Sequence, residues 1–430
     1  MLHPHPLRMG AMNIDLTELI AGLALPFIPP DWPSRWKAFR HTDPDPAFSI
    51  AEEAIEDTLA FCQYSYDVAQ AIRETADRVR RDPGLIAMTR FLFDLFFAEP
   101  PPDPVSLATW PFVTSALPTL AALLPALMLV AGVPKVRQAH TARNIPETIT
   151  RATLSDLEVW MRTFRREHGH WGLMNLNWLS NHWHGKLYRL GRLQFMQGRF
   201  PSMVRVFQET ATNRVLALAE PGTIRYRQDG LVDGTQDVFD PSAWTPTLTR
   251  TSDTITGHPV DPAGYVQKRS ITLPTRAWRQ VLAPGDPMLD IHIPEGGAMD
   301  FQACGQSLQQ APPFFSRHFS ENPAPLTFYC ATWFFDSQLQ AILSPQTNII
   351  RFQREFYLYP IRSTEDETFR RVFGSKPTNL HTAPRDTSLR RAILDFTLSG
   401  HHLRCAAGFR LLTAPPWGSA PYQQAAPPLG

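Results

Sequence analysis

Cysteine is scarce in this chain, and its cysteines lie far apart. The 430 residues include only four, Cys62, Cys304, Cys330 and Cys405. None forms a Cys-x-x-Cys pair, so the sequence shows neither a zinc-ribbon pattern nor a dense disulfide framework. Such sparse use of cysteine is typical of a reducing compartment, and we expect the protein to be cytoplasmic.

An excess of either charge is also lacking. Lysine and arginine total 41 and aspartate and glutamate total 40, which leaves a formal net charge of +1. A chain this close to neutral has no broad field to attract nucleic acid or an anionic membrane surface, and we expect neither as a partner. The N-terminus has no charged start followed by an apolar core, so we interpret residues 1–12 as a loose leader.

Charged residues are absent altogether from residues 105–133, a stretch long enough to cross a bilayer. Pro111, Pro118 and Pro125 interrupt it, and each would break or kink a helix. We therefore expect a buried helix pair in the N-terminal part of the protein rather than a membrane span.

The pattern of the chain changes near residue 150. Residues 50–81 place apolar side chains at helical intervals among charges, whereas residues 190–228 hold short strand-like runs joined by turn residues. A length of 430 residues exceeds one ordinary core, so two domains are expected. We predict a helical N-terminal domain at 13–149, a mixed domain at 150–413 and a disordered tail at 414–430.

Strands and helices alternate in the second half of the mixed domain. Asp300 is a candidate N-cap for a helix that Pro312 and Pro313 would stop or kink. This alternation indicates an α+β or α/β fold. The predicted elements are a strand at 288–294, a Gly-Gly loop, a helix after Asp300, a strand at 326–333, a short helix at 335–343 and a third strand at 348–360.

Six segments carry a family resemblance that covers most of residues 10–410. They are NIPETITRATLSDLEVW (144–160), YRLGRLQF (188–195), GDPMLDIHIPEGG (285–297), SLQQAPPFFSRHF (307–319), FYCATWFFDSQL (328–339) and NIIRFQREF (348–356). In order and spacing they resemble acyltransferases that join a helical N-acyltransferase N-terminal domain to a GNAT-like C-terminal domain. One feature departs from the usual pattern. The phosphate-binding signature Gln/Arg-x-x-Gly-x-Gly/Ala has no full copy. The segment QACGQS at 302–307 departs from it at one residue, the last, which is serine.

The resemblance implies both a fold and a reaction class. The fold is a helical N-terminal domain followed by a GNAT-like mixed α/β domain with a largely antiparallel sheet. The reaction moves an acyl group from acyl-CoA or an acyl carrier protein to the amine of a small molecule or peptide, in a bacterial enzyme that needs no metal. The incomplete phosphate signature leaves open an alternative, a non-catalytic module that binds thioesters or peptides.

The run from Asp290 to Gly297 holds residue types that acyl transfer needs, namely a base and flexible backbone near the reacting carbonyl. Side chains alternate along a strand, so Asp290 and His292 share a face and the carboxylate can orient the imidazole. Glu295 follows the strand end, and either His292 or Glu295 is the candidate base. Gly296 and Gly297 free the backbone to approach a pyrophosphate at the next helix N-terminus, or simply make a strand-to-helix turn.

Cys330 is a further candidate. On a strand beside the first, its thiol could approach His292 and form a Cys-His nucleophilic pair. That pair would make the protein a thioester hydrolase, whereas the commoner role of such a residue is a buried structural cysteine.

Basic residues cluster just before the first strands. Lys186, Arg189 and Arg192 surround Tyr188 and could contact the phosphates of the carrier. The commoner role of such a run is a solvated face whose side-chain stems cover apolar surface.

A histidine-rich run precedes this basic cluster and resembles a metal site. It contains His168, His170, His182 and His184. On a helix, His182 and His184 would point about 200° apart and could not share one ion, so no metal is expected here.

Overall fold

The computed structural model describes residues 14–39, 41–112 and 117–423. The chain forms two compact units, of which unit 1 runs to Leu190 and includes Pro294–Gly296, while unit 2 contains Gly191–Ile293 and the chain from Gly297 onward. The predicted leader at 1–12 and the last residues of the predicted tail lie outside the described residues.

Unit 1 is helical, with the short strand β1 (Leu187–Leu190) at its end. Aspartate caps begin several of its helices: Asp15, Asp82 and Asp103 each accept hydrogen bonds from backbone N–H groups of the first turn. The helices are α1 (Leu16–Gly22), α2 (Trp32–Phe39), α3 (Glu52–Cys62), α4 (Tyr66–Arg80), α5 (Pro83–Phe96), α6 (Pro104–Ala108), α7 (Thr119–Ala131), α8 (Val133–Ala142), α9 (Glu147–Leu154), α10 (Asp156–His168) and α11 (Leu176–Trp183).

The core of unit 1 forms around α7, whose residues are buried on every side from Ala121 to Ala131. Within the described residues, Thr119–Ala142 is long and apolar enough to cross a membrane, and 78% of its most apolar window is buried inside the protein. Of the buried helix pair predicted within residues 105–133, α7 is a buried helix, whereas the short helix α6 before it buries only Leu107.

The boundary between the units differs from the predicted one at 149/150. Leu154, Leu157, Trp160 and Leu179, from α9, α10 and α11, belong to the same apolar core as the earlier helices. Burial of these side chains holds the three helices in unit 1, and the division therefore falls after Leu190.

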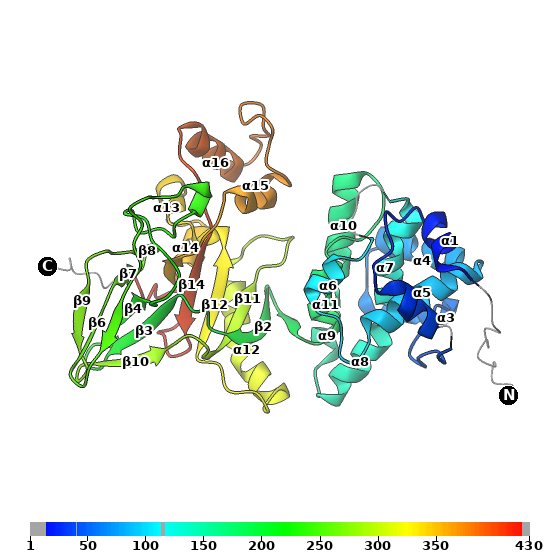
Figure 1. Cartoon of the computed structure of the whole chain (residues 1–430), viewed down its shortest axis with the longest axis horizontal. Coiled ribbons are helices and arrows are strands. Elements are labelled where there is room, and N and C mark those ends of the chain that lie inside the picture. The colour runs from blue at the N-terminus through cyan, green and yellow to red at the C-terminus, as the bar shows by residue number, and fades with distance from the viewer. Residues whose placement is uncertain (1–13, 40, 113–116, 424–430) are drawn as a thin grey trace. The chain divides into compact units, whose positions relative to one another are not determined.

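Unit 2 contains three sheets and peripheral helices (Figure 1). In the first sheet the order β2-β11-β12-β14-β13 combines one parallel pair, β11 with β12, with antiparallel neighbours. Helix α12 (Phe301–His318) connects the parallel pair, as a parallel crossover requires. The strands are β2 (Leu193–Arg199), β11 (Pro287–His292), β12 (Thr327–Thr332), β13 (Tyr357–Pro360) and β14 (Ala406–Leu411).

The other two sheets are antiparallel, with strand orders β10-β3-β4-β7-β8 and β5-β6-β9. One apolar cluster joins Val206 and Ala217 of the second sheet to Tyr359 and Phe409 of the first, so these two sheets share a core. The strands are β3 (Val204–Glu209), β4 (Val215–Ala219), β5 (Leu248–Arg250), β6 (Thr254–Gly257), β7 (Pro259–Asp261), β8 (Tyr265–Val266), β9 (Ile271–Pro274) and β10 (Trp278–Leu282).

A second cluster in unit 2 packs the helices that follow β12. Trp333, Leu339, Ile350, Phe369 and Ile393 are among its buried members. Figure 1 shows α15 and α16 beyond one end of the strands of the first sheet. The helices are α13 (Leu339–Ile342), α14 (Asn348–Arg354), α15 (Asp366–Phe373) and α16 (Ser388–Leu398).

One element prediction in unit 2 was wrong. Residues 348–360 were expected to be one strand, but Asn348–Arg354 is helix α14 and only Tyr357–Pro360 is a strand. Thr347 accepts a hydrogen bond from the N–H of Ile350 and caps the helix, which fixes its start. Pro312 and Pro313 were expected to stop or kink α12, and the helix continues through both to His318, so they do not stop it.

The chain beyond residue 414 was expected to be disordered, but its described part packs on unit 2. Trp417 stacks on Phe301 with ring centroids 4.8 Å apart. The Tyr422 hydroxyl accepts a hydrogen bond of 2.9 Å from the N–H of Leu411, and Tyr422 is buried. These two aromatic side chains give the proline-rich segment enough apolar contact to be held in place.

Candidate active site

The first sheet opens between its two parallel strands. The ladder between β11 and β12 begins at Met288 and Thr327 and ends at Asp290 and Tyr329. Beyond that point β11 continues against β2 as far as His292, and β12 continues against β14 as far as Thr332. Beyond Asp290 and Tyr329 the two strands therefore no longer pair with each other.

Asp290 and His292 lie on the same face of β11, as the alternation of side chains predicts. The distance from Oδ2 of Asp290 to Nε2 of His292 is 3.4 Å. Both side chains are largely enclosed, with 19% of Asp290 and 27% of His292 exposed. A carboxylate at this distance can orient the imidazole and limit its rotation, which suits a general base.

Two tyrosines adjoin this pair, and the sequence alone did not point to either. Tyr329 pairs with Asp290 across the ladder and so shares its face. Burial, together with the Asp290 carboxylate, raises the pKa of the Tyr329 hydroxyl, and burial also raises that of Tyr359. Both phenols therefore keep their protons at neutral pH.

The loop after β11 has a backbone that only glycine adopts easily. Gly296 and Gly297 have φ angles of +86° and +73°, and Asp300 accepts a hydrogen bond from the N–H of Ala303 at the start of α12. Arg192 reaches this loop, donating from Nε to the carbonyl oxygen of Ala298 at 3.0 Å. Arg192, which was predicted to contact phosphate, therefore also holds the glycine loop in place.

Two other predicted residues fall in unit 1. Glu295 accepts a hydrogen bond of 3.3 Å from the Thr163 hydroxyl and lies 3.8 Å from the Arg166 guanidinium. Arg189 donates from its backbone N–H to the Thr153 hydroxyl at 3.0 Å. Of the two candidate bases, His292 is therefore the one that unit 2 places beside the strand opening.

Cys330 does not pair with His292. The register that aligns Asp290 with Tyr329 places the next residue, Cys330, on the opposite face of the sheet from His292. Burial raises the pKa of the Cys330 thiol well above its usual range. A buried thiol that resists ionisation does not act as a nucleophile, so Cys330 has the structural role.

The histidine-rich run does not assemble a metal site. His182 lies 3.3 Å from the Asp156 carboxylate, and His184 bonds the carbonyl oxygen of Phe96 through Nε2. In the described part of the chain, no three His, Cys, Asp or Glu side chains are grouped so that they could hold a metal ion.

Domain families cover most of the chain. Residues 53–185 match the N-acyltransferase N-terminal domain, and residues 187–410 match the GNAT-like C-terminal domain. The second match alone spans more than half of the 430 residues. The comparison with curated proteins gives no significant match.

Solved acyltransferase structures share this fold. An acyltransferase in complex with decanoyl-CoA and teicoplanin has 22% sequence identity and a TM-score of 0.60, over 93% of this chain and 100% of that chain. An acyltransferase mutant in complex with octanoyl-CoA has 22% identity and a TM-score of 0.59 over the same shares. Both confirm the predicted fold. Because an N-acyltransferase N-terminal domain is followed in the sequence by a GNAT-like C-terminal domain, this chain is a member of the GNAT-like acyltransferase family.

Proposed function

We propose that this enzyme transfers an acyl group from acyl-CoA to the amine of a small molecule or peptide, with His292 as the base. The observation that carries the proposal is the opening between β11 and β12 directly beyond Asp290 and Tyr329, next to the Asp290–His292 pair. The solved acyltransferases with decanoyl-CoA and with teicoplanin support this donor and a peptide-like acceptor. An acyl carrier protein would be a second possible donor.

The reaction balances with the groups present. The acceptor ammonium gives one proton to His292, and the neutral nitrogen attacks the thioester carbonyl carbon. A C–N bond forms and the C–S bond breaks. The second proton, which the nitrogen loses as it becomes an amide, passes to the departing CoA thiolate. Backbone N–H groups of β12 beyond Tyr329 would stabilise the oxyanion.

The glycine loop is the proposed pyrophosphate site. Gly296 and Gly297 are exposed and have positive φ angles, and α12 begins four residues after Gly297, at Phe301. Arg192 would hold this loop in shape through its bond to Ala298. We also propose a cytoplasmic location, which the four cysteines support because all are free and buried.

Release of free CoA thiol tests the proposal directly. The purified chain is incubated with acetyl-, octanoyl- and decanoyl-CoA and a panel of amines, and thiol release and amide formation are followed together. His292→Ala should lower kcat by about 10²- to 10⁴-fold, the usual contribution of a general base. His401→Ala, at an exposed histidine of the same unit, serves as the matched control.

The two alternatives give different results in this assay. Tight binding of acyl-CoA without thiol release would identify a non-catalytic module. Thiol release without amide formation would identify a hydrolase. Unchanged turnover in His292→Ala would refute the assignment of the base.

A further inference from the structure

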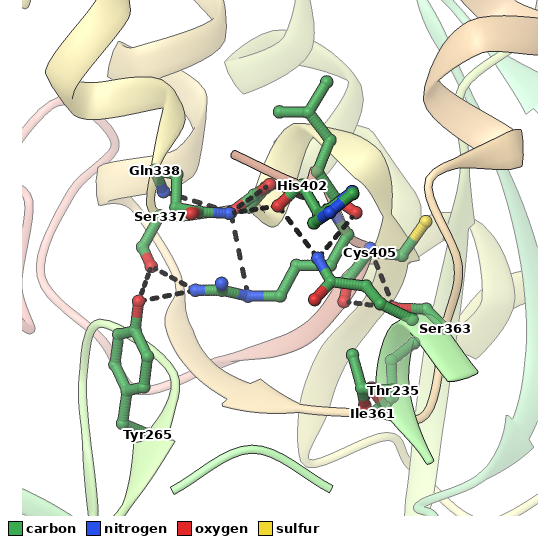
Figure 2. A network of polar contacts seen from close by, with 12 residues as sticks. Thr235, Tyr265, Ser337, Gln338, Ile361, Ser363, His402 and Cys405 are labelled. Carbon is green, nitrogen blue, oxygen red and sulfur yellow. Dashed lines mark hydrogen bonds and ion pairs between the residues drawn. The ribbon is translucent and has the colours of Figure 1, made fainter. Parts of the chain in front are cut away.

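A polar network with a buried centre surrounds Arg404 in unit 2. Figure 2 shows Tyr265 and Ser337 at one end of it and Ser363 and Cys405 at the other. It joins the loop before β5, strand β8, the segment after β12 and the segment before β14. We call the part of it around Arg404 the Arg404 network, and its side chains are those of Gln236, Tyr265, Asp336, Ser337, Gln338 and Arg404.

Arg404 and Asp336 form the centre of the network. The Arg404 guanidinium donates to the Tyr265 hydroxyl at 2.6 Å and to the Ser337 hydroxyl at 3.2 Å. Its Nε lies 3.7 Å from Asp336, whose other oxygen accepts the backbone N–H of Arg404 at 3.0 Å. Only 7% of the Arg404 side chain and 1% of the Asp336 side chain are exposed. Loss of either partner would leave a buried charge without compensation.

Gln236 joins the network in a strained conformation. Its φ angle is +59°, in the left-handed region that disfavours a residue with a Cβ. Its amide donates to the carbonyl oxygens of His402 and Leu403 at 2.8 and 3.0 Å. Strain of this kind persists where surrounding contacts fix the backbone, and such places are often functional.

The network lies beyond the ends of the strands at which β11 and β12 separate. Thr332, the last residue of β12, pairs with Ala406, the first residue of β14. Asp336 and Arg404 lie just beyond these two residues, so their contact extends the β12–β14 pairing past its last bridge. Residues 330–332 of β12 need this support because the pairing of β12 with β11 ends at Tyr329.

We propose that the Arg404 network positions the free edge of β12 for the thioester donor. Arg404 and Asp336 act here as positioning residues and do not contact the reacting atoms. This inference rests on the proposed entry of acyl-CoA between β11 and β12. Without the network, the half of β12 that has a single paired neighbour would move, and donor binding would weaken before the chemical step is affected.

The chain offers a closely matched control, the buried pair of Arg410 and Glu355. Their side chains are 3.1 Å apart and are 7% and 2% exposed, close to the values for Arg404 and Asp336. Arg410 pairs on β14 with Phe328, at the opposite end of β12 from the opening. Arg404→Gln and Arg410→Gln thus remove similar buried charges, but only the first touches the proposed donor edge.

The first readout is steady-state kinetics at a temperature well below the unfolding midpoints of all variants. Arg404→Gln should raise KM for acyl-CoA about tenfold and leave kcat within about twofold, while Arg410→Gln leaves both within about twofold. Tyr265→Phe removes one hydroxyl only and should raise KM about twofold, so it remains informative if Arg404→Gln does not fold. Arg404→Lys, which keeps the charge, should restore part of the loss.

The second readout is hydrogen exchange of residues 330–335, which needs no turnover. We expect faster exchange there in Arg404→Gln and Tyr265→Phe than in Arg410→Gln. An inactive wild-type protein would refute the proposed function while exchange still tests the positioning. Unchanged exchange in this segment, or an unchanged KM in a chain that does turn over acyl-CoA, overturns the inference.

Discussion

Asp290 is the last residue of β11 that pairs with β12, and its partner there is Tyr329. This position puts a carboxylate where the two strands separate and 3.4 Å from the His292 imidazole. We therefore expect catalysis to depend on the charge of the Asp290 side chain rather than on its shape.

Asp290→Asn should lower kcat/KM about tenfold, equivalent to ~1.4 kcal/mol of transition-state stabilisation. The amide has nearly the shape of the carboxylate but cannot stabilise an imidazolium electrostatically. Kinetics over pH 6 to 9 would measure the loss, with Asp286→Asn as the control in the preceding turn. Equal rates for wild type and Asp290→Asn would show that the pair has no part in catalysis.

Gly297→Ala should weaken binding of acyl-CoA and barely change the thermal midpoint. A Cβ at this position meets nothing within 4 Å, so its effect arises from the φ angle of +73°. Alanine resists this conformation by roughly 1–2 kcal/mol, and the loop would change shape. Calorimetric titration with CoA measures the effect.

Gly285→Ala provides the control for that experiment. Gly285 has a φ angle of +85° and equally open surroundings, but it lies in the turn before β11. Both variants thus carry similar strain. A similar affinity for CoA in the two variants would count against the glycine loop as the pyrophosphate site.

The protein should lose stability as the pH falls from about 6.5 towards 4, because His140 is buried as the neutral imidazole. Burial lowers the pKa of His140 from 6.5 to about 4, and its side chain is 2% exposed. The unfolded chain therefore binds more protons between these two values, so stability is full above pH 6.5 and declines below it. The difference corresponds to about 3 kcal/mol.

Thermal unfolding from pH 7.5 to 4.5 measures this decline. His140→Gln should flatten the pH dependence, whereas His41→Gln, at an exposed histidine, should leave it unchanged. The same slope in wild type and His140→Gln would mean that other groups are responsible. His184 has a pKa lowered to about 4 by burial and should account for part of the remaining slope.

Much of the fold follows from local sequence patterns, and so does one feature of the site. Alternation along β11 was enough to place Asp290 and His292 on one face. The run from Asn348 to Arg354 misled because its β-branched and aromatic residues suit a buried strand or a buried helix equally well. Ile350 packs in the apolar cluster of the helices that follow β12, and this packing favours the helix.

The rest of the site depends on contacts between distant segments. The face on which Cys330 lies is set by the register of β12 against β11, and a shift of one residue would reverse it. Arg192 meets the carbonyl of Ala298 across 106 positions of sequence. Arg404 reaches Tyr265 across 139. No local pattern carries such pairings, and a single sequence gives no other trace of them.

Because all four cysteines are buried, labelling of their thiols can follow the unfolding of each unit separately. Cys62 belongs to unit 1, while Cys304, Cys330 and Cys405 belong to unit 2. Burial raises the pKa of Cys62 to about 11 and those of Cys304 and Cys405 to about 12, so reagents that attack thiolates must wait for local or global opening. Mass spectrometry of the labelled peptides would then time the opening of each half of the chain without any engineered dye.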